Sequence, residues 1–319
     1  MSRGASANLL IVRRPRVPQD NGNDDNGRQR RKDDWREFLA DKGEQTKERA
    51  FEKLETFNPK IGYPNKWRDY SALTIKPGDL VGNIMRARSF AYNRNISKLG
   101  KPIDREEWGM TPQTVNAYYN SSMNEIVFPA SILQPPFFDM RADDAVNYGA
   151  IGAVIGHEMT HGFDDSGSQF DAKGNLRNWW SEEDLAKFKE RARCIEEQYN
   201  GFKLDDGTPL NGKLVNGEAI ADLGGLKVAW LAYQKSLEGK PKPADVDGFT
   251  HEQRFFLGYA QVWAATHTPQ FELLQTNTDE HALPRFRLNG TLANFPEFHK
   301  AFNCKAGDPM VRAAQCNIW

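Results

Sequence analysis

The sequence has no long apolar run, no excess of charge of one sign and few cysteines. No apolar stretch approaches the ~20 residues that a membrane-spanning helix needs, so no transmembrane segment is expected. The 42 Lys and Arg residues nearly balance the 43 Asp and Glu residues, which gives a formal net charge of -1. Overall charge therefore gives no reason to expect nucleic acid or an acidic membrane as a partner. With three cysteines, the chain cannot pair all of its thiols internally.

Residues 1–33 differ in composition from the rest of the chain. They are polar, with basic residues at Arg13, Arg14 and 28–32 and a Gly/Asn/Asp stretch between them. This composition predicts a disordered arm, because too little apolar surface is present to offset the cost of ordering. The basic run could instead bind nucleic acid, but a solvated arm is the better interpretation. The arm also lacks the long apolar core and small-residue cleavage site of a secretory signal.

Residues 34–319 are long enough to bury a substantial core, and we expect them to form one domain with residues 34–105 as a helical lead-in. Three segments have the apolar spacing of helices, namely residues 35–57, 79–98 and 181–199. Ser181 is the predicted N-cap of the last one. Residues 126–128 predict a short strand. The expected fold class is therefore mainly α (α+β).

The strongest functional signal is the pentapeptide His157-Glu158-Met159-Thr160-His161. On a helix, residues four apart lie on one face, so the two imidazoles can bind one ion together. Glu158 is not needed as a ligand and is free to act on a water molecule at the metal. The motif alone could also arise by chance on a surface helix.

The residues before this motif favour a buried helix. The run 148–156 is apolar and small, Asp143 or Asp144 offers an N-cap, and Gly162 is a plausible stop. Two histidines and a glutamate on a buried helix need a partner, because unpaired buried polar groups are costly. A metal ion would be such a partner.

Glu218 is the best candidate for a third ligand, since catalytic zinc takes three protein ligands and leaves one position for water. It opens a second apolar stretch that predicts another buried helix. Asp222 lies one turn later and could accept a hydrogen bond from a ligand imidazole. From spacing alone, a glutamate favoured by the helix dipole is an equally good interpretation of Glu218. Gly224 and Gly225 predict close packing of this helix against the first.

Several ordered blocks resemble neprilysin-like zinc metallopeptidases, and most of all their bacterial secreted oligopeptidase members. The blocks are residues 116–119, 127–130, 133–138, 157–165 and 217–225. The similarity runs from about Lys53 to the end of the chain. It implies a gluzincin, with a thermolysin-like metal centre in a mainly helical catalytic domain and a small β-sheet at the cleft edge. The resemblance further implies that the strand at 126–128 lies at this edge, where a substrate backbone could extend the sheet.

The resemblance also implies a metal set and a general base. His157, His161 and Glu218 would bind one zinc ion per chain. Glu158 would take a proton from the water at the metal and later deliver a proton to the departing amine.

Further residues match family positions with supporting roles. Asp164 and Asp222 would orient the metal-binding imidazoles. His281, oriented by Asp279, would stabilise the tetrahedral oxyanion. His281 and Asp222 complete the expected catalytic set with the general base. Arg287 would hold a substrate carbonyl on the primed side. By themselves, His281 could be a loop histidine and Arg287 a surface charge; their order within the blocks favours the functional roles.

The resemblance also implies how a peptide would be bound. Asn116 and the backbone of Ala117 would hydrogen-bond the substrate main chain. An apolar pocket for the side chain after the cleaved bond would be formed by Ile132, Phe137, Val154 and Trp263. The remaining histidines match no family position and are interpreted as surface or satisfied core residues: His251, His267 and His299.

Cys194 and Cys316 lie where family members pair a mid-domain helix with the chain terminus. The resemblance implies this disulfide in an oxidising, extracellular or periplasmic compartment. Two reduced, buried thiols are an equally good alternative. Cys304 would then lack a partner in this chain.

Relatives in the family carry a large helical domain before the catalytic one, and too few residues precede the similarity here to contain it. We expect an exposed apolar surface where such a domain would dock. The predicted function is a zinc-dependent endopeptidase that cleaves oligopeptides on the amino side of hydrophobic residues. The alternative is a catalytically impaired, truncated module that binds zinc or peptide.

Overall fold

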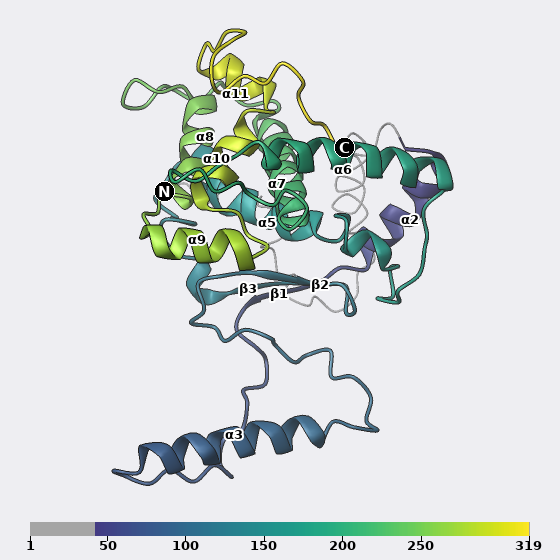
Figure 1. Cartoon of the computed structure of the whole chain (residues 1–319), viewed down its shortest axis with the longest axis vertical. Coiled ribbons are helices and arrows are strands. Elements are labelled where there is room, and N and C mark those ends of the chain that lie inside the picture. Colours follow the sequence, from purple (N-terminus) through teal and green to yellow (C-terminus); the bar gives the residue numbers. More distant parts are fainter. Residues whose placement is uncertain (1–41, 319) are drawn as a thin grey trace.

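The computed structural model describes residues 42–318, and most of its regular structure is helical (Figure 1). The helices are α2 (Glu44–Glu55), α3 (Leu80–Ile96), α4 (Asp144–Asn147), α5 (Ala153–Thr160), α6 (Glu182–Asn200), α7 (Asn216–Leu237), α8 (His251–Val262), α9 (Pro269–Thr278), α10 (Pro284–Leu292) and α11 (Pro296–Ala301). The strands are β1 (Asn58–Gly62), β2 (Tyr118–Asn120) and β3 (Glu125–Pro129). This confirms the mainly helical prediction. The predicted arm at 1–33 and the start of the helix predicted at 35–57 lie outside the described residues.

The three strands form one sheet in the order β1-β3-β2, with β1 parallel and β2 antiparallel to β3. The strand predicted at 126–128 is present as β3, and all five of its residues are buried. The expectation that a substrate could extend the sheet at this strand is wrong, because β3 is paired on both sides. The outer strand next to it is β2, whose tyrosines line the cavity described below.

The predicted buried helix before the histidine motif forms from Asp144 to Thr160 in three consecutive parts. These are α4, a wider π-helical stretch (Tyr148–Gly152) and α5. Asp143 is the N-cap, and its carboxylate accepts a hydrogen bond of 2.9 Å from the Val146 N–H. Widened turns of this kind occur mostly inside α-helices and are frequent at functional sites. The helix ends at Thr160, close to the stop predicted at Gly162.

α5 packs closely against α7, as the glycines of the second helix predicted. A methyl group added at Gly225 would lie 2.3 Å from the backbone nitrogen of His157. One added at Gly156 would lie 2.4 Å from the Gly225 carbonyl oxygen. Neither helix can carry a side chain at this crossing, so the two backbones touch directly. This contact places the histidine motif opposite the first turn of α7.

The main hydrophobic core surrounds α7 and includes aromatic residues of α6, α7 and α8, among them Phe188, Trp230 and Phe255. A disulfide between Cys194 and Cys316 joins α6 to the end of the described chain, so the pairing implied by the family resemblance is present. Ser181 caps α6 as predicted. A second apolar cluster lies between the sheet and the π-helical stretch.

α3, capped by Asp79, matches the helix predicted at 79–98 and stands apart from the helical body, beyond the sheet (Figure 1). None of its residues is buried. Exposed large apolar side chains concentrate on α3 and its flanking segments: Tyr63, Trp67, Tyr70, Ile75, Leu80, Val81, Ile84, Met85, Tyr92, Ile96, Leu99 and Ile103. Within residues 42–318, no helix has the length and apolar character needed to cross a bilayer.

Gly225→Ala is expected to lower the free energy of unfolding by about 1–3 kcal/mol, because the added methyl group would force α5 and α7 apart. Chemical denaturation of the purified chain measures this change. Gly152→Ala is the matched control in the neighbouring helical segment, where an added methyl group would have only ordinary contacts of 3.6 Å and longer. Equal stability of the Gly225 variant and the wild type would contradict the proposed backbone contact.

Candidate metal centre and cleft

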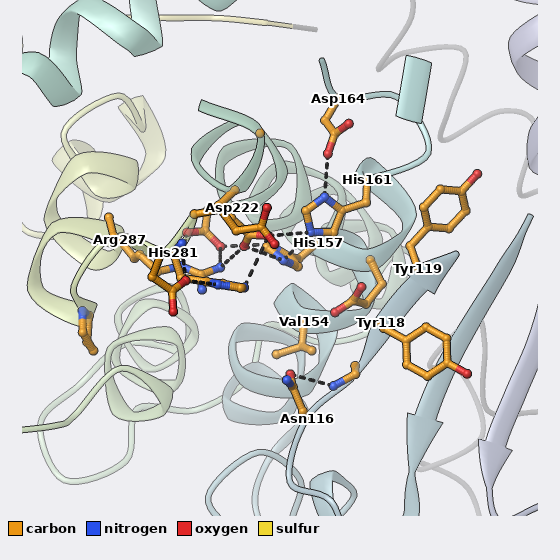
Figure 2. Close-up of a pocket in the computed structure, with 18 of the residues that line it drawn as sticks. Asn116, Tyr118, Tyr119, Val154, His157, His161, Asp164, Asp222, His281 and Arg287 are labelled. Atoms are coloured by element: carbon orange, nitrogen blue, oxygen red, sulfur yellow. Dashed lines mark hydrogen bonds and ion pairs between the residues drawn. The ribbon is translucent and has the colours of Figure 1, made fainter. Parts of the chain in front are cut away.

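A cavity of about 1130 Å³ opens between the sheet edge, α5, the first turn of α7 and the region of α9 and α10 (Figure 2). The structure brings every site residue predicted from the sequence to the lining of this one cavity. These residues are Asn116, Ala117, Ile132, Phe137, Val154, His157, Glu158, His161, Asp164, Glu218, Asp222, Trp263, Asp279, His281 and Arg287. They come from segments up to about 170 residues apart in the chain, which only the tertiary fold can unite.

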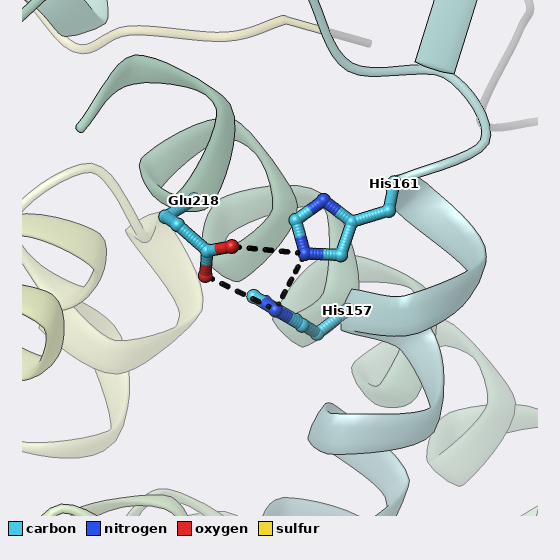
Figure 3. A group of neighbouring side chains, drawn as sticks. All are labelled: His157, His161 and Glu218. Atoms are coloured by element: carbon cyan, nitrogen blue, oxygen red, sulfur yellow. Dashed lines mark hydrogen bonds and ion pairs between the residues drawn. The ribbon is translucent and has the colours of Figure 1, made fainter. Parts of the chain in front are cut away.

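His157, His161 and Glu218 converge on one point (Figure 3). The two Nε2 atoms are 2.9 Å apart. Glu218 Oε2 is 3.4 Å from His157 Nε2, and Glu218 Oε1 is 3.3 Å from His161 Nε2. Ligands about 2.05 Å from a tetrahedral zinc ion lie about 3.3 Å from one another. The two imidazole–carboxylate separations, one to each Glu218 oxygen, are close to this value, and the nitrogen pair is closer at 2.9 Å.

Each imidazole of this group faces a second carboxylate on its other side. Asp164 Oδ2 is 2.6 Å from His161 Nδ1, and Asp222 Oδ1 is 2.9 Å from His157 Nδ1. The second pair is a charge contact rather than a well-aligned hydrogen bond. Contacts of this kind fix which nitrogen faces a metal.

The neighbouring carboxylates also change the acidity of the two rings. Burial alone would lower the pKa of His157 and His161, but Asp222 and Glu218 raise the pKa of His157, and Asp164 and Glu218 raise that of His161. A metal ligand must be a neutral imidazole, so zinc and protons compete for these nitrogens.

Glu158 lies on α5 between the two histidines and is buried at the cavity wall. Burial raises the pKa of its carboxyl group above the usual value, although the nearby histidines oppose this change. A carboxylate with a raised pKa is better suited to exchange protons near neutrality.

His281 reaches the same group from the segment between α9 and α10. Its Nδ1 is 2.7 Å from Asp279 Oδ1, and its backbone N–H donates a 2.9 Å hydrogen bond to the same oxygen. Its Nε2 lies 3.4 Å from Glu218 Oε1. Asp279 thus holds the ring with Nε2 toward the candidate metal position.

Arg287 connects the carboxylates of α7 in a way that the sequence did not suggest. Its Nε and one terminal nitrogen each donate a 2.7 Å hydrogen bond to Asp222, and that same terminal nitrogen donates one of 3.1 Å to Glu218. The guanidinium also lies over the Trp263 ring, 4.2 Å from its centroid. Burial would raise the pKa of Asp222, but Arg287 and His157 hold it below its usual value. Both carboxylates therefore stay charged and fixed inside the protein.

The predicted substrate-binding residues lie on two walls of the cavity. Ile132, Phe137 and Val154 share the apolar cluster behind the sheet, whereas Trp263 packs against the main core. The Ala117 N–H donates a 2.9 Å hydrogen bond to the Asn116 side chain, so this amide already has a partner. In Figure 2, the tyrosines of β2 lie to the right of the histidines, Asn116 lies below them, and His281 and Arg287 lie to the left.

His267 was predicted to be an ordinary histidine, but it lines the cavity and packs its ring against Phe271 at 4.8 Å between centroids. It lies between two helices, where no periodicity marks an inward-facing side chain. His251 and His299 fit the prediction, because each is buried with a partner, Tyr233 Oη and the Met310 carbonyl respectively. Glu280, also missed, lines the cavity with its carboxylate near His281 and Glu218.

The family model of peptidase family M13 matches residues 116–318. Neprilysin-3 of Drosophila melanogaster is 42% identical over 289 residues, which cover 86% of this chain and 36% of that protein. Endothelin-converting enzyme 1 of Homo sapiens is 41% identical over 285 residues, which cover 86% of this chain and 37% of that protein. The chain therefore spans less than two fifths of the length of these relatives.

Among solved structures, the zinc metalloprotease ZMP1 of Mycobacterium tuberculosis in complex with an inhibitor matches 92% of this chain and 46% of its own. The TM-score is 0.87 at 45% sequence identity. PepO from Lactobacillus rhamnosis matches with a TM-score of 0.81 at 33% identity, over 91% of this chain and 45% of its own. These likenesses confirm the predicted thermolysin-like, mainly helical fold class.

The purified chain is expected to hold about one zinc ion, and His161→Ala to lose most of it, because the variant removes one of three converging ligands. Metal analysis after dialysis measures the zinc content. His267→Ala is the matched control, since this histidine lines the same cavity outside the converging group. Retention of zinc by the His161 variant, or its loss from the His267 variant, would contradict the assignment.

Proposed function

The chain belongs to peptidase family M13, and from this premise we propose that it is a zinc-dependent endopeptidase of oligopeptides. One zinc ion would be held by His157, His161 and Glu218. The observation that carries the proposal is the convergence of these three side chains in a cavity that also contains every other predicted site residue.

Zinc, when bound, would polarise the scissile carbonyl and make water easier to deprotonate. Glu158 would accept a proton from the attacking water and then deliver a proton to the amine as the C–N bond breaks. Its burial and raised pKa suit both transfers near neutrality.

Negative charge on the former carbonyl oxygen would be stabilised by His281, whose ring is held by Asp279 with Nε2 toward the cleft. Asp222 and Asp164 would keep the two ligand imidazoles oriented during the reaction. Arg287 would hold a substrate carbonyl on the primed side while it anchors Asp222 and Glu218.

A peptide would bind along the sheet edge at β2, with Asn116 and the Ala117 backbone as main-chain partners. The apolar residues Ile132, Phe137 and Val154 line the cavity from one apolar cluster, and Trp263 lines it from the main core. This arrangement supports cleavage on the amino side of a hydrophobic residue. Since every predicted catalytic position is filled and lines one cavity, a catalytically impaired binding module is not favoured.

The exposed apolar side chains of α3 and its flanking segments support docking of a further helical domain of the kind found in relatives. Such a domain would cover the only described helix that has no buried residue. The Cys194–Cys316 disulfide supports an oxidising location, extracellular or periplasmic.

Glu158→Gln is expected to lower kcat by about 10²–10⁴-fold, because the amide cannot exchange the two protons. Hydrolysis of short quenched-fluorescent peptides measures this loss, and metal analysis should show unchanged zinc. Glu280→Gln, which changes another carboxyl group of the same cavity, should remain within a few-fold of wild type. Normal turnover by the Glu158 variant would refute the role of general base.

Val154→Trp is expected to fill the apolar wall and to change specificity. For peptides with Leu or Phe after the cleaved bond, kcat/KM should fall about 10–200-fold relative to peptides with Ala there. Mass spectrometry of the products identifies the bond that is broken. An unchanged preference would place the specificity pocket elsewhere.

A further inference from the structure

Lys53 of α2 is fully buried, which is unusual for a lysine. Its Nζ donates hydrogen bonds of 2.7 Å to the carbonyl oxygens of Gly167 and Phe170. Three aromatic rings surround it, with centroids 5.7–5.9 Å from Nζ: Tyr119, Phe163 and Trp179. Burial lowers the pKa of Lys53 to about 7, so keeping an ammonium group here is costly. Two N–H groups suffice for the two carbonyls, and either protonation state provides them.

The first of these carbonyls belongs to a loop that holds Asp164. The Gly167 N–H donates a 2.6 Å hydrogen bond to Asp164 Oδ1, and the Ser166 N–H donates one of 2.9 Å to the same oxygen. The other oxygen of this carboxylate lies 2.6 Å from His161 Nδ1. A continuous series of contacts therefore runs from Lys53 through Gly167 and Asp164 to a candidate zinc ligand.

The loop also packs directly on the backbone of that ligand. A methyl group added at Gly167 would lie 1.7 Å from the His161 carbonyl oxygen, so the loop has no room to move closer. The second carbonyl bound by Lys53, that of Phe170, closes the other end of the same turn. Lys53 thus ties both ends of the loop that follows Asp164 to α2.

On its other side, Lys53 is linked to the sheet. Its carbonyl oxygen accepts a 2.9 Å hydrogen bond from the Asn124 side chain. The Tyr119 hydroxyl of β2 donates a 2.9 Å hydrogen bond to the same amide group. Lys53 therefore lies between the cleft edge of the sheet and the loop behind the histidines.

We propose that Lys53 is a positioning residue for the metal centre, acting through Gly167 and Asp164 to hold the imidazole of His161. The inference rests on the proposed zinc site. Loss of the two hydrogen bonds would remove the side-chain donor of the Phe170 carbonyl and leave the Gly167 carbonyl with only the Phe170 N–H, at 3.0 Å. The loop would then be held less firmly against α2, and Asp164 would orient His161 less well. Loss of a group that orients a ligand typically lowers metal affinity 10–100-fold.

The test is a double-mutant cycle on zinc affinity, measured on the full chain by competition with a chelator. Lys53→Met keeps an unbranched side chain, one atom shorter, but removes the donor, and should weaken zinc binding about 10-fold. Asp164→Asn should weaken it 10–100-fold. The double variant should bind zinc about as well as Asp164→Asn alone, because both changes break one series of contacts.

Lys60→Met is the matched control. Lys60 is another buried lysine, whose Nζ lies 2.6 Å from Glu125 and donates a 2.9 Å hydrogen bond to the Glu107 carbonyl instead of to the loop. Lys60→Met should lower the free energy of unfolding but change zinc affinity by no more than about two-fold. This should hold both in the wild-type chain and in the Asp164→Asn variant. A general effect of losing a buried lysine would instead weaken zinc binding in both variants.

The proposal is overturned if Lys53→Met binds zinc as tightly as wild type, or if the losses from Lys53→Met and Asp164→Asn multiply. If Lys53→Met does not fold, Lys53→Gln, which keeps N–H donors on a shorter side chain, replaces it and should give a smaller loss with the same non-additivity. A wild-type chain that binds no zinc would refute the proposed function itself. Zinc binding that is indifferent to Lys53 would refute only this inference.

Discussion

The direct backbone contact between α5 and α7 is the constraint on which the rest of the site depends. Gly156 and Gly225 leave no side chain between the two helices, so the face that carries His157 lies against the first turns of α7. The carboxylate of Glu218 can then lie within 3.4 Å of both imidazoles, although some 60 residues separate them in sequence. The lack of room for a side chain where α5 crosses α7 thus sets the positions of the three candidate metal ligands.

The balance of charge explains why Arg287 lies beside the two carboxylates of α7. Glu218 and Asp222 are buried, and isolated buried carboxylates would be costly. Arg287 bonds to both, and each also faces an imidazole. The two negative carboxylates face only one positive guanidinium and two imidazole rings. A further positive charge between His157, His161 and Glu218 would therefore be favourable. The donor set therefore suits a divalent cation on electrostatic as well as geometric grounds.

The sequence predicted what local rules govern: the helix caps at Asp143 and Ser181, the histidine face and the carboxylates of α7. Family resemblance added the residues that come from distant segments. The expectation that a substrate extends the sheet at residues 126–128 was wrong, because the partners of this strand are set by tertiary packing rather than by its own composition. Lys53 and His267 were missed, since a buried lysine and an inward-facing loop histidine leave no periodic signal.

The π-helical stretch between α4 and α5 links two close packing contacts. Gly149, inside the stretch, lies against the α8 backbone, and Gly156, after it, lies against that of α7. A π turn accommodates one residue more than an α turn, and each residue of an α-helix rotates the chain by about 100°. Deletion of a single residue here would rotate the histidines relative to the part of the helix that packs on α8. Either the contact with α8 or the contact with α7 would then be lost. Insertions and deletions in this stretch therefore disturb the packing of both helices on either side of the metal centre.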